Sequence, residues 1–197
     1  MARKEIVVLE RPESVSWEKI RAVLQEAHSD NVKKGIVLLY PSLSAEELYA
    51  KTEGRGGKML VALCEGKVVG TGAVAIIEKE FWCGNGKYAY CFLDAVLPDY
   101  QGQGIYAKIV EWQENYARSV GVDRMMFDTH EQNKRMIKIS IKHGYRKIQY
   151  RIKDGRNSVV LVKWLNGCPY SRLQCARIYY RKKREKINNK KNGCEFA

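Results

Sequence analysis

The segment VLPDYQGQGIYAKIV, residues 96–110, constrains the fold of this chain more than any other segment. An apolar run ends at Pro98, glycines follow at Gly102 and Gly104, and a helical spacing of apolar residues begins. This pattern is typical of a strand that turns through glycines into an amphipathic helix. The unpaired N–H groups of a first helical turn, together with the helix dipole, favour a bound anion. The segment therefore predicts either simple turn chemistry or a phosphate site.

Hydrophobic periodicity predicts the elements around this turn. They are a strand over 5–10, helices over 14–29 and 44–53, strands on both sides of a turn at 65–67, a third strand over 88–97, a helix over 105–120, a strand over 123–130, a helix over 131–144 and a hairpin over 145–165. The order βααβββαβαββ predicts an α+β fold with a mostly antiparallel, twisted sheet of about seven strands and helices on both faces. One helical crossover is expected to join two neighbouring parallel strands.

The helix after the glycine turn has a predicted apolar face. Ile105, Ile109, Trp112, Tyr116 and Val120 follow one another at three- and four-residue steps, which is the spacing of one side of an amphipathic helix.

Length and charge predict one domain with a basic appendage. The 197 residues suit a single domain, which we place at residues 1–165, with a basic extension at 166–197. The chain carries a formal charge of +13, and more than half of this excess lies after residue 167.

No long apolar run and no signal-peptide pattern is present in the sequence, which predicts a cytoplasmic protein without a membrane span. The six cysteines form no CxxC pair, so reduced thiols and no metal site are expected.

A dinucleotide is one candidate for the anion. The spacing Gly102-x-Gly104-x-x-Ala107 formally fits the dinucleotide-binding fingerprint. That fingerprint requires a tight strand–turn–helix early in a parallel array. Here it follows a predicted antiparallel meander past the middle of the chain, and the setting argues against a dinucleotide.

Two motifs resemble those of the GNAT acyltransferase superfamily. The first is Gln/Arg-x-x-Gly-x-Gly/Ala after a strand that ends in Val-x-Pro, and here Gln101-Gly102-Gln103-Gly104-Ile105-Tyr106 follows Val96-Leu97-Pro98. The second is Asn-x-x-Ala-x-x-Leu-Tyr-x-Lys-x-Gly-Phe, and the segment from Asn133 to Tyr145 matches it in frame. The resemblance covers residues 5–165 and implies the GNAT fold, with acetyl-CoA as co-substrate and no metal.

The resemblance also implies a set of cofactor-binding residues. The pantetheine arm would pair with the backbone of Ala95 and Val96 as an added strand. The pyrophosphate would lie on backbone N–H groups of the glycine turn, and an asparagine would contact the cofactor from the second motif. The implied residues are Ala95, Val96, Gln101, Gly102, Gln103, Gly104, Ile105, Tyr106, Ala107 and Asn133. Tyr106 departs from the family pattern, which has Gly or Ala there, and Asn133 could equally be a helix cap.

Acetyl transfer to an amine needs a base for the amine proton and an acid for the thiolate. Relatives commonly place the base on the strand after the crossover helix, which implies Asp128; pairing with one of the many basic residues is the alternative. Ser140 stands where many members have a tyrosine that protonates the thiolate, and its hydroxyl is a poorer acid. Asp94 and His130 are further candidates, for which ion pairing and plain solvent exposure are the competing interpretations.

The basic tail and the acceptor leave two functions open. The segment 170–191 mixes Tyr179 and Tyr180 with basic residues, a pattern that suits RNA or DNA, a solvated extension or a short docking helix. The leading hypothesis is an acetyl-CoA-dependent N-acetyltransferase that acts on a small-molecule or protein amine, as a monomer or homodimer. The alternative is a non-catalytic GNAT-fold module that binds acyl-CoA, or nucleic acid through its tail.

Overall fold

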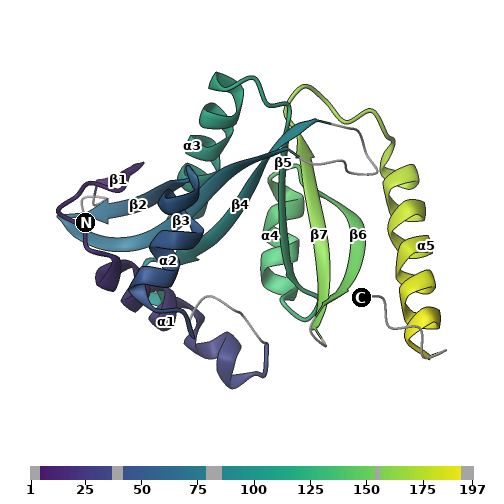
Figure 1. Cartoon of the computed structure of the whole chain (residues 1–197), viewed down its shortest axis with the longest axis horizontal. Helices are drawn as coiled ribbons and strands as arrows, with labels where there is room; N and C mark the ends of the chain where they lie inside the picture. The colour runs from purple at the N-terminus through teal and green to yellow at the C-terminus, as the bar shows by residue number, and fades with distance from the viewer. Residues whose placement is uncertain (1–4, 37–41, 79–85, 154–155, 192–197) are drawn as a thin grey trace. The chain divides into compact units, whose positions relative to one another are not determined.

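The structure is a computed structural model that describes residues 5–36, 42–78, 86–153 and 156–191 (Figure 1). It divides into two compact units, Met1–Met125 and Met126–Ala197.

The first unit contains an antiparallel sheet of four strands in the order β1-β2-β3-β4. Its elements along the chain are β1 (Ile6–Glu10), α1 (Trp17–Lys33), α2 (Ala45–Lys51), the 3-10 turn η2 (Glu53–Arg55), β2 (Lys58–Cys64), β3 (Lys67–Glu78), β4 (Lys87–Val96), the 3-10 turn η3 (Pro98–Tyr100) and α3 (Ile105–Ser119). β2, β3 and β4 form the antiparallel meander expected from the sequence, and β1, which precedes α1 and α2, pairs antiparallel with β2.

Serine caps begin the first two helices. The hydroxyl of Ser16 accepts from the Lys19 N–H at the start of α1. Ser44 and Glu47 form a reciprocal capping box at the start of α2. These caps satisfy N–H groups that the helices leave unpaired, and they explain why both helices begin where they do.

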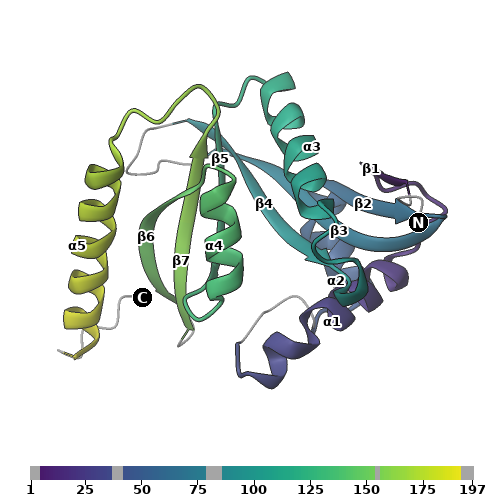
Figure 2. The same ribbon diagram turned by 180° about the vertical axis from the view of Figure 1, so that it is seen from behind.

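Two apolar clusters hold the first unit together, one on each face of the sheet. The larger joins Ile20, Leu24 and Leu48 of α1 and α2 to alternate residues of β2, β3 and β4. The smaller joins Ile105 and Ile109 of α3 to the opposite faces of β1, β2 and β3. Helices therefore cover both faces, with α3 seen from its outer side in Figure 2.

The predicted face of α3 is partly wrong. Ile105 and Ile109 are buried as expected, but the buried stripe continues through Gln113 and Ala117. Trp112 and Tyr116 are only partly buried and stack on each other at 5.6 Å between ring centroids, and Val120 is 43% exposed. The predicted face was drawn through the large apolar residues, so it took Trp112 and Tyr116 instead of the buried Gln113 and Ala117.

The second unit contains three strands in the order β5-β7-β6. Its elements are β5 (Arg124–His130), which begins two residues before the unit, α4 (Lys134–Lys142), β6 (Arg146–Lys153), β7 (Arg156–Trp164) and α5 (Arg172–Lys191). β6 and β7 form the predicted antiparallel hairpin, with Arg146 opposite Val162 and Lys153 opposite Arg156. The two turn residues at 154–155 lie outside the described residues.

The helix α5 packs along β6. Cys175 and Tyr179 are buried on its inner side, and the ammonium of Lys147 on β6 lies 5.8 Å from the centroid of the Tyr179 ring. Lys183 forms an ion pair with Glu131 and lies over the ring of Tyr150. Of the three interpretations of the tail, the structure shows the docked helix, although one much longer than expected.

The predicted fold class is confirmed. In the part of the chain that the structure describes, seven strands, paired mostly antiparallel, and four α-helices follow the predicted α+β order, and α5 is added after them. Cys64 and Cys91 are buried in strands as expected, whereas Cys83 and Cys194 lie outside the described residues. Among the helices that the structure describes, none is both long enough and apolar enough to span a bilayer.

Candidate acetyl-CoA site

A β-bulge in β4 lies just before Ala95 and Val96, the two residues predicted to pair with the pantetheine arm. Thr71 pairs with Ala95 but Ala73 pairs with Phe92, so Gly72 faces two residues, Leu93 and Asp94. Leu93 has a φ of 58°, a left-handed conformation that is rare without a glycine. The buried hydroxyl of Thr71 donates to the Leu93 carbonyl at 2.8 Å. Bulges re-aim a strand and recur beside active sites, and this one re-aims β4 just before Ala95.

Ala95 and Val96 end β4 directly after the bulge. Ala95 is buried and Val96 is partly buried, and on one side they pair with Thr71 and Gly70 of β3. A Cβ on Gly70 would lie only 3.0 Å from the Ala95 carbonyl oxygen, so glycine permits this close pairing. The backbone of the predicted pantetheine strand is therefore held from the β3 side.

The turn between β4 and α3 is built by two left-handed glycines. Gly102 has a φ of 79° and Gly104 a φ of 82°, a region that costs an L-residue with a Cβ roughly 1–2 kcal/mol. A Cβ on either would meet no atom of the described residues within 4 Å. Backbone conformation, not crowding by protein atoms, requires glycine at both positions, and their outer side is open to a ligand.

The side chains of the two glutamines in the turn donate hydrogen bonds to backbone carbonyls of the same segment. The Gln101 side chain donates to the Val96 carbonyl at 3.1 Å, and that of Gln103 donates to the Asp99 carbonyl at 3.2 Å. Both side chains thus tie the loop to the residues that end β4 and form η3. Their amides hold the shape of the turn.

The first turn of α3 presents N–H groups without a side-chain cap. Gly104 is the N-cap residue, and no side chain of the described residues caps it. The first helical hydrogen bond runs from the Lys108 N–H to the Gly104 carbonyl at 3.2 Å. The N–H groups of Ile105, Tyr106 and Ala107 precede this bond and so have no acceptor within the helix. No acidic residue lies in this first turn. The donor set fits a phosphate group, which such N–H groups and the helix dipole both favour.

The side chains of this first turn divide into one buried anchor and two partly exposed residues. Ile105 is 1% exposed and packs into the smaller apolar cluster. Tyr106 and Ala107 are partly exposed. Ile105 therefore fixes the helix end against the sheet, while Tyr106 and Ala107 keep part of their surface exposed.

In the second unit, Asn133 caps α4. Its side-chain oxygen accepts from the Met136 N–H at 3.3 Å, and its amide donates to the Thr129 hydroxyl at 3.2 Å. Asp128 lies one residue before Thr129 on β5 and is partly exposed. The helix-cap role of Asn133 is confirmed, and its contact with a cofactor stays a prediction.

Ser140 and His130 have identifiable partners in the second unit. Ser140 is fully buried, and its hydroxyl donates to the Met136 carbonyl one turn earlier in α4, at 2.8 Å. The Nδ1 atom of His130 accepts from the Gln132 N–H at 3.2 Å, so a neutral His130 carries its proton on Nε2. The catalytic roles of Asp128 and Ser140 stay predictions from the resemblance.

A polar pair between β4 and α3 was missed by sequence reasoning. The fully buried Gln113 donates to Asp94 Oδ1 at 2.8 Å and to the Ala73 carbonyl at 3.2 Å. Its own side-chain oxygen is buried and has no hydrogen-bond partner among the described residues. Burial raises the pKa of Asp94 to about 7, although hydrogen bonds with Gln113 and the Ala73 backbone work against this rise. The one signal in the sequence was Gln113 itself, four residues after Ile109 on the buried stripe.

Solved structures with this fold include several acetyltransferases. An acetyltransferase from Streptococcus agalactiae is 21% identical with a TM-score of 0.63, over 81% of this chain and 98% of that one. A Salmonella typhimurium protein solved with its cofactor acetyl-CoA is 16% identical with a TM-score of 0.62, over 85% and 98%. A ribosomal-protein alanine N-acetyltransferase from Escherichia coli is 16% identical with a TM-score of 0.61, over 85% and 98%. A search of curated protein sequences finds no match.

The family is shown by sequence. The profile of the acetyltransferase (GNAT) family matches residues 17–145, well over half of the chain. The chain therefore belongs to the GNAT acetyltransferase family, as its two motifs predicted. The matched range contains both the glycine turn and α4.

The Asp94 carboxyl predicts a particular dependence of stability on pH. Its pKa is about 7 in the folded chain and about 3.9 in an unfolded one. Between these values the folded state binds more protons, so the free energy of unfolding falls as the pH rises through this window. We expect Asp94→Asn to reduce the fall in melting temperature between acidic and mildly alkaline buffer, measured by circular dichroism. Asp99→Asn, at an exposed carboxyl of η3, is the control, and an unchanged pH profile for Asp94→Asn would contradict the interpretation.

Proposed function

We propose that this chain is an N-acetyltransferase that transfers the acetyl group of acetyl-CoA to a primary amine by direct attack on the thioester. Membership of the GNAT acetyltransferase family supports acetyl transfer. A neighbour of the same fold was solved with acetyl-CoA, which supports the choice of acyl donor. The acceptor is a small-molecule or protein amine.

The observation that carries the proposal is the glycine turn at the start of α3. Gly102 and Gly104 hold left-handed backbone, and α3 then starts without a side-chain cap among the described residues. We assign the pyrophosphate of acetyl-CoA to the N–H groups from Gly102 to Ala107, with Gln101 and Gln103 shaping the loop. The open side of both glycines lets phosphate oxygens approach the backbone closely.

The end of β4 is assigned to the pantetheine arm. The bulge at Leu93 and Asp94 re-aims the strand, and the arm would pair with backbone groups of Ala95 and Val96 as an added strand does. A backbone N–H near Val96 would polarise the thioester carbonyl and stabilise the oxyanion of the tetrahedral intermediate. The chain's contribution here is orientation and charge stabilisation by backbone groups.

Proton transfers are assigned to residues of the second unit. Asp128 takes the proton of the attacking amine, directly or through water, and Asn133 contacts the cofactor from the cap of α4. Ser140 occupies the position from which the thiolate's proton comes in many relatives. Because its hydroxyl already donates to Met136, we propose that a water supplies this proton and that Ser140 supports α4.

The activity itself is tested with a panel of amines. The full chain is incubated with acetyl-CoA and each amine, and free CoA thiol is followed with a thiol reagent. Release that depends on one class of amine supports the transferase. Saturable binding of acetyl-CoA with no thiol release from any amine would favour a binding module.

Gly104→Ala is expected to weaken acetyl-CoA binding at least about tenfold by disturbing the turn, at a stability cost of roughly 1–2 kcal/mol. Gly66→Ala is the matched control, because Gly66 also has positive φ and an open Cβ position but lies in the hairpin between β2 and β3. We expect a similar loss of stability in both variants and a loss of affinity, by titration calorimetry, in Gly104→Ala alone. Equal affinities in the two variants would remove the turn from the proposed site.

Asp128→Asn is expected to lower kcat/KM about 10²–10⁴-fold, the usual contribution of a positioned base, without changing the affinity for acetyl-CoA. Ser140→Ala is expected to lower stability by about 1 kcal/mol through loss of one hydrogen bond, with kcat nearly unchanged. Asp123→Asn, at an exposed aspartate just before β5, is the control. An unchanged rate and pH profile in Asp128→Asn would contradict its role as the base.

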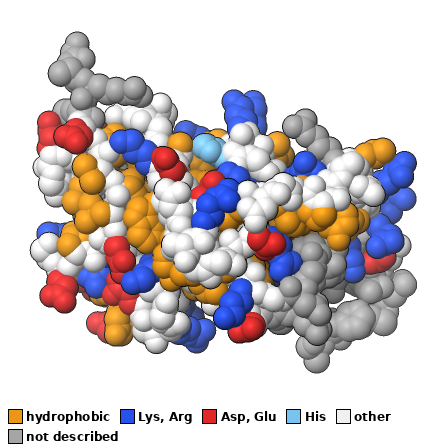
Figure 3. Space-filling view, turned by 90° about the horizontal axis from the view of Figure 1, so that it is seen from above, with side chains coloured by type: hydrophobic (Ala, Val, Ile, Leu, Met, Phe, Trp, Pro, Cys, Tyr) orange, Lys and Arg blue, Asp and Glu red, His pale blue; other side chains and the backbone are white. Residues whose placement is uncertain are grey.

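A second candidate function is nucleic-acid binding through α5. Leu173, Arg177, Tyr180 and Arg184 are exposed at helical spacing on the side opposite the buried Cys175 and Tyr179. In Figure 3, blue Lys and Arg side chains lie along the right edge, which is the side on which Figure 1 draws α5. Cations beside an exposed aromatic ring suit phosphates and stacked bases.

Replacing Arg177 and Arg184 together by Gln is expected to weaken binding of labelled single-stranded RNA, and to reduce the slope of log affinity against log salt by about 1.4. The measurement is fluorescence anisotropy at several salt concentrations. The control replaces Lys19 and Lys51, exposed in α1 and α2, which removes the same charge elsewhere. Equal weakening by both pairs would show non-specific attraction and reject α5 as the binding face.

A further inference from the structure

The thiols of two cysteines lie close together at the start of α5. Cys168 lies in the loop after β7, and Cys175 lies in the first turn of α5. Their sulfur atoms are 4.0 Å apart, and neither is in a disulfide. They are seven residues apart, so their proximity depends on how the loop folds back on the helix.

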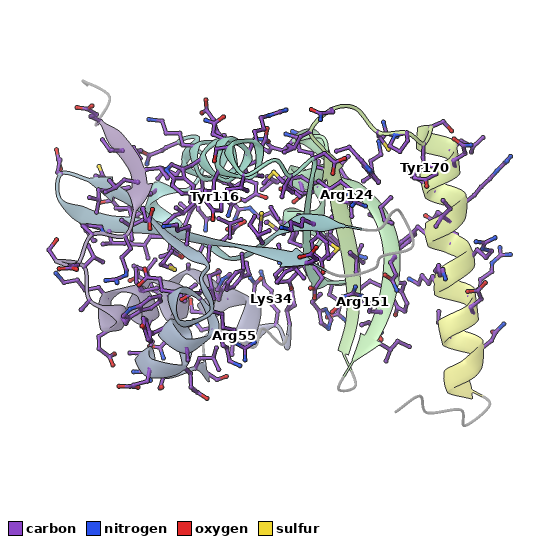
Figure 4. All side chains as sticks on the ribbon, turned by 45° about the horizontal axis from the view of Figure 1, so that its top comes forward. Lys34, Arg55, Tyr116, Arg124, Arg151 and Tyr170 are labelled. Carbon is purple, nitrogen blue, oxygen red and sulfur yellow. The ribbon has the colours of Figure 1, made fainter. Side chains whose placement is uncertain are left out.

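The loop is held in this shape by a capping box and an arginine. The Ser171 hydroxyl accepts from the Gln174 N–H at 3.2 Å, and the Gln174 side chain accepts from the Ser171 N–H at 2.7 Å. Arg146 at the start of β6 donates to the carbonyl of Tyr170, which Figure 4 labels at the entry to α5. The closeness of the two sulfurs therefore follows from well-defined local contacts.

The two thiols differ in exposure and share a cation. Cys175 is 3% exposed, whereas Cys168 is partly exposed. Arg146 reaches the Cys175 sulfur at 3.8 Å. Burial raises the pKa of the Cys168 thiol, and the Arg146 charge works against this rise. A peroxide would therefore meet Cys168 first and find a second thiol directly behind it.

We propose that Cys168 and Cys175 form a reversible redox modification site, which closes to a disulfide under hydrogen peroxide and fixes the start of α5 to the loop after β7. The Cys168 thiol gives up its proton and the thiolate attacks peroxide; the O–O bond breaks, a sulfenic acid forms, and the departing hydroxide takes up the released proton as one water. Cys175 then attacks the Cys168 sulfur, the S–O bond breaks, and the hydroxyl leaves with the Cys175 proton as a second water. Two thiols are oxidised and one peroxide is reduced, and a dithiol reductant restores both thiols.

Peptide mapping tests this site directly. The reduced full chain is treated with hydrogen peroxide, alkylated and digested with trypsin, which cleaves after Arg172 between the two cysteines. We expect a disulfide-linked pair of peptides, 164–172 with 173–177, to exceed any other linkage at least about tenfold, and to disappear with dithiothreitol. The intact chain should lose about 2 Da, the mass of two hydrogens.

Variants separate this site from general thiol oxidation. Cys168→Ser and Cys175→Ser should each abolish the linked peptides, and Cys175→Ser should leave a sulfenic acid on Cys168 that dimedone traps. Cys194→Ser is the control and should keep the linkage. The proposal is overturned if Cys168 is found linked mainly to another cysteine, or if Cys168 oxidises to sulfinic acid without a linkage in the wild-type chain.

Discussion

The left-handed backbone at Gly102 and Gly104 is the constraint on which the candidate site depends. These two residues, separated by Gln103, let the chain leave β4 and enter α3 with no side-chain cap from the described residues. Any residue with a Cβ would strain that path. The helix therefore begins with N–H groups that precede its first intrahelical hydrogen bond, and such groups favour a bound phosphate.

The rest of the first unit supports this turn from both faces of the sheet. Ile105 anchors the helix end in the smaller apolar cluster, while Leu93 and Ala95 belong to the larger one. Between them, the bulge at Leu93 and Asp94 re-aims the strand. The strain of Leu93 in a left-handed conformation is offset in part by the buried hydrogen bond from Thr71. Asp94 and Gln113 place polar groups at the same point of an otherwise apolar layer.

Much of the fold was predictable because its signals are local. Hydrophobic periodicity predicted the strands and helices, and the two motifs around Gly102 and Asn133 predicted the family. The bulge at Leu93 was not predictable, because it belongs to the pairing of β4 with β3, where the Thr71 hydroxyl donates to the Leu93 carbonyl. Gln113 was missed because a polar residue on a buried stripe is explained only by its partner Asp94. The docking of α5 was one of three readings of the tail, since Glu131, which pairs with Lys183, is 52 residues away in the sequence.

We propose that backbone N–H groups from Gly102 to Ala107 hold the pyrophosphate of acetyl-CoA. Hydrogen–deuterium exchange of the full chain, with and without saturating acetyl-CoA, measures those amides directly. We expect exchange of these amides to slow on binding, by at least about tenfold where opening is required for exchange. Acetyl-CoA that binds while leaving the exchange of these amides unchanged would contradict it.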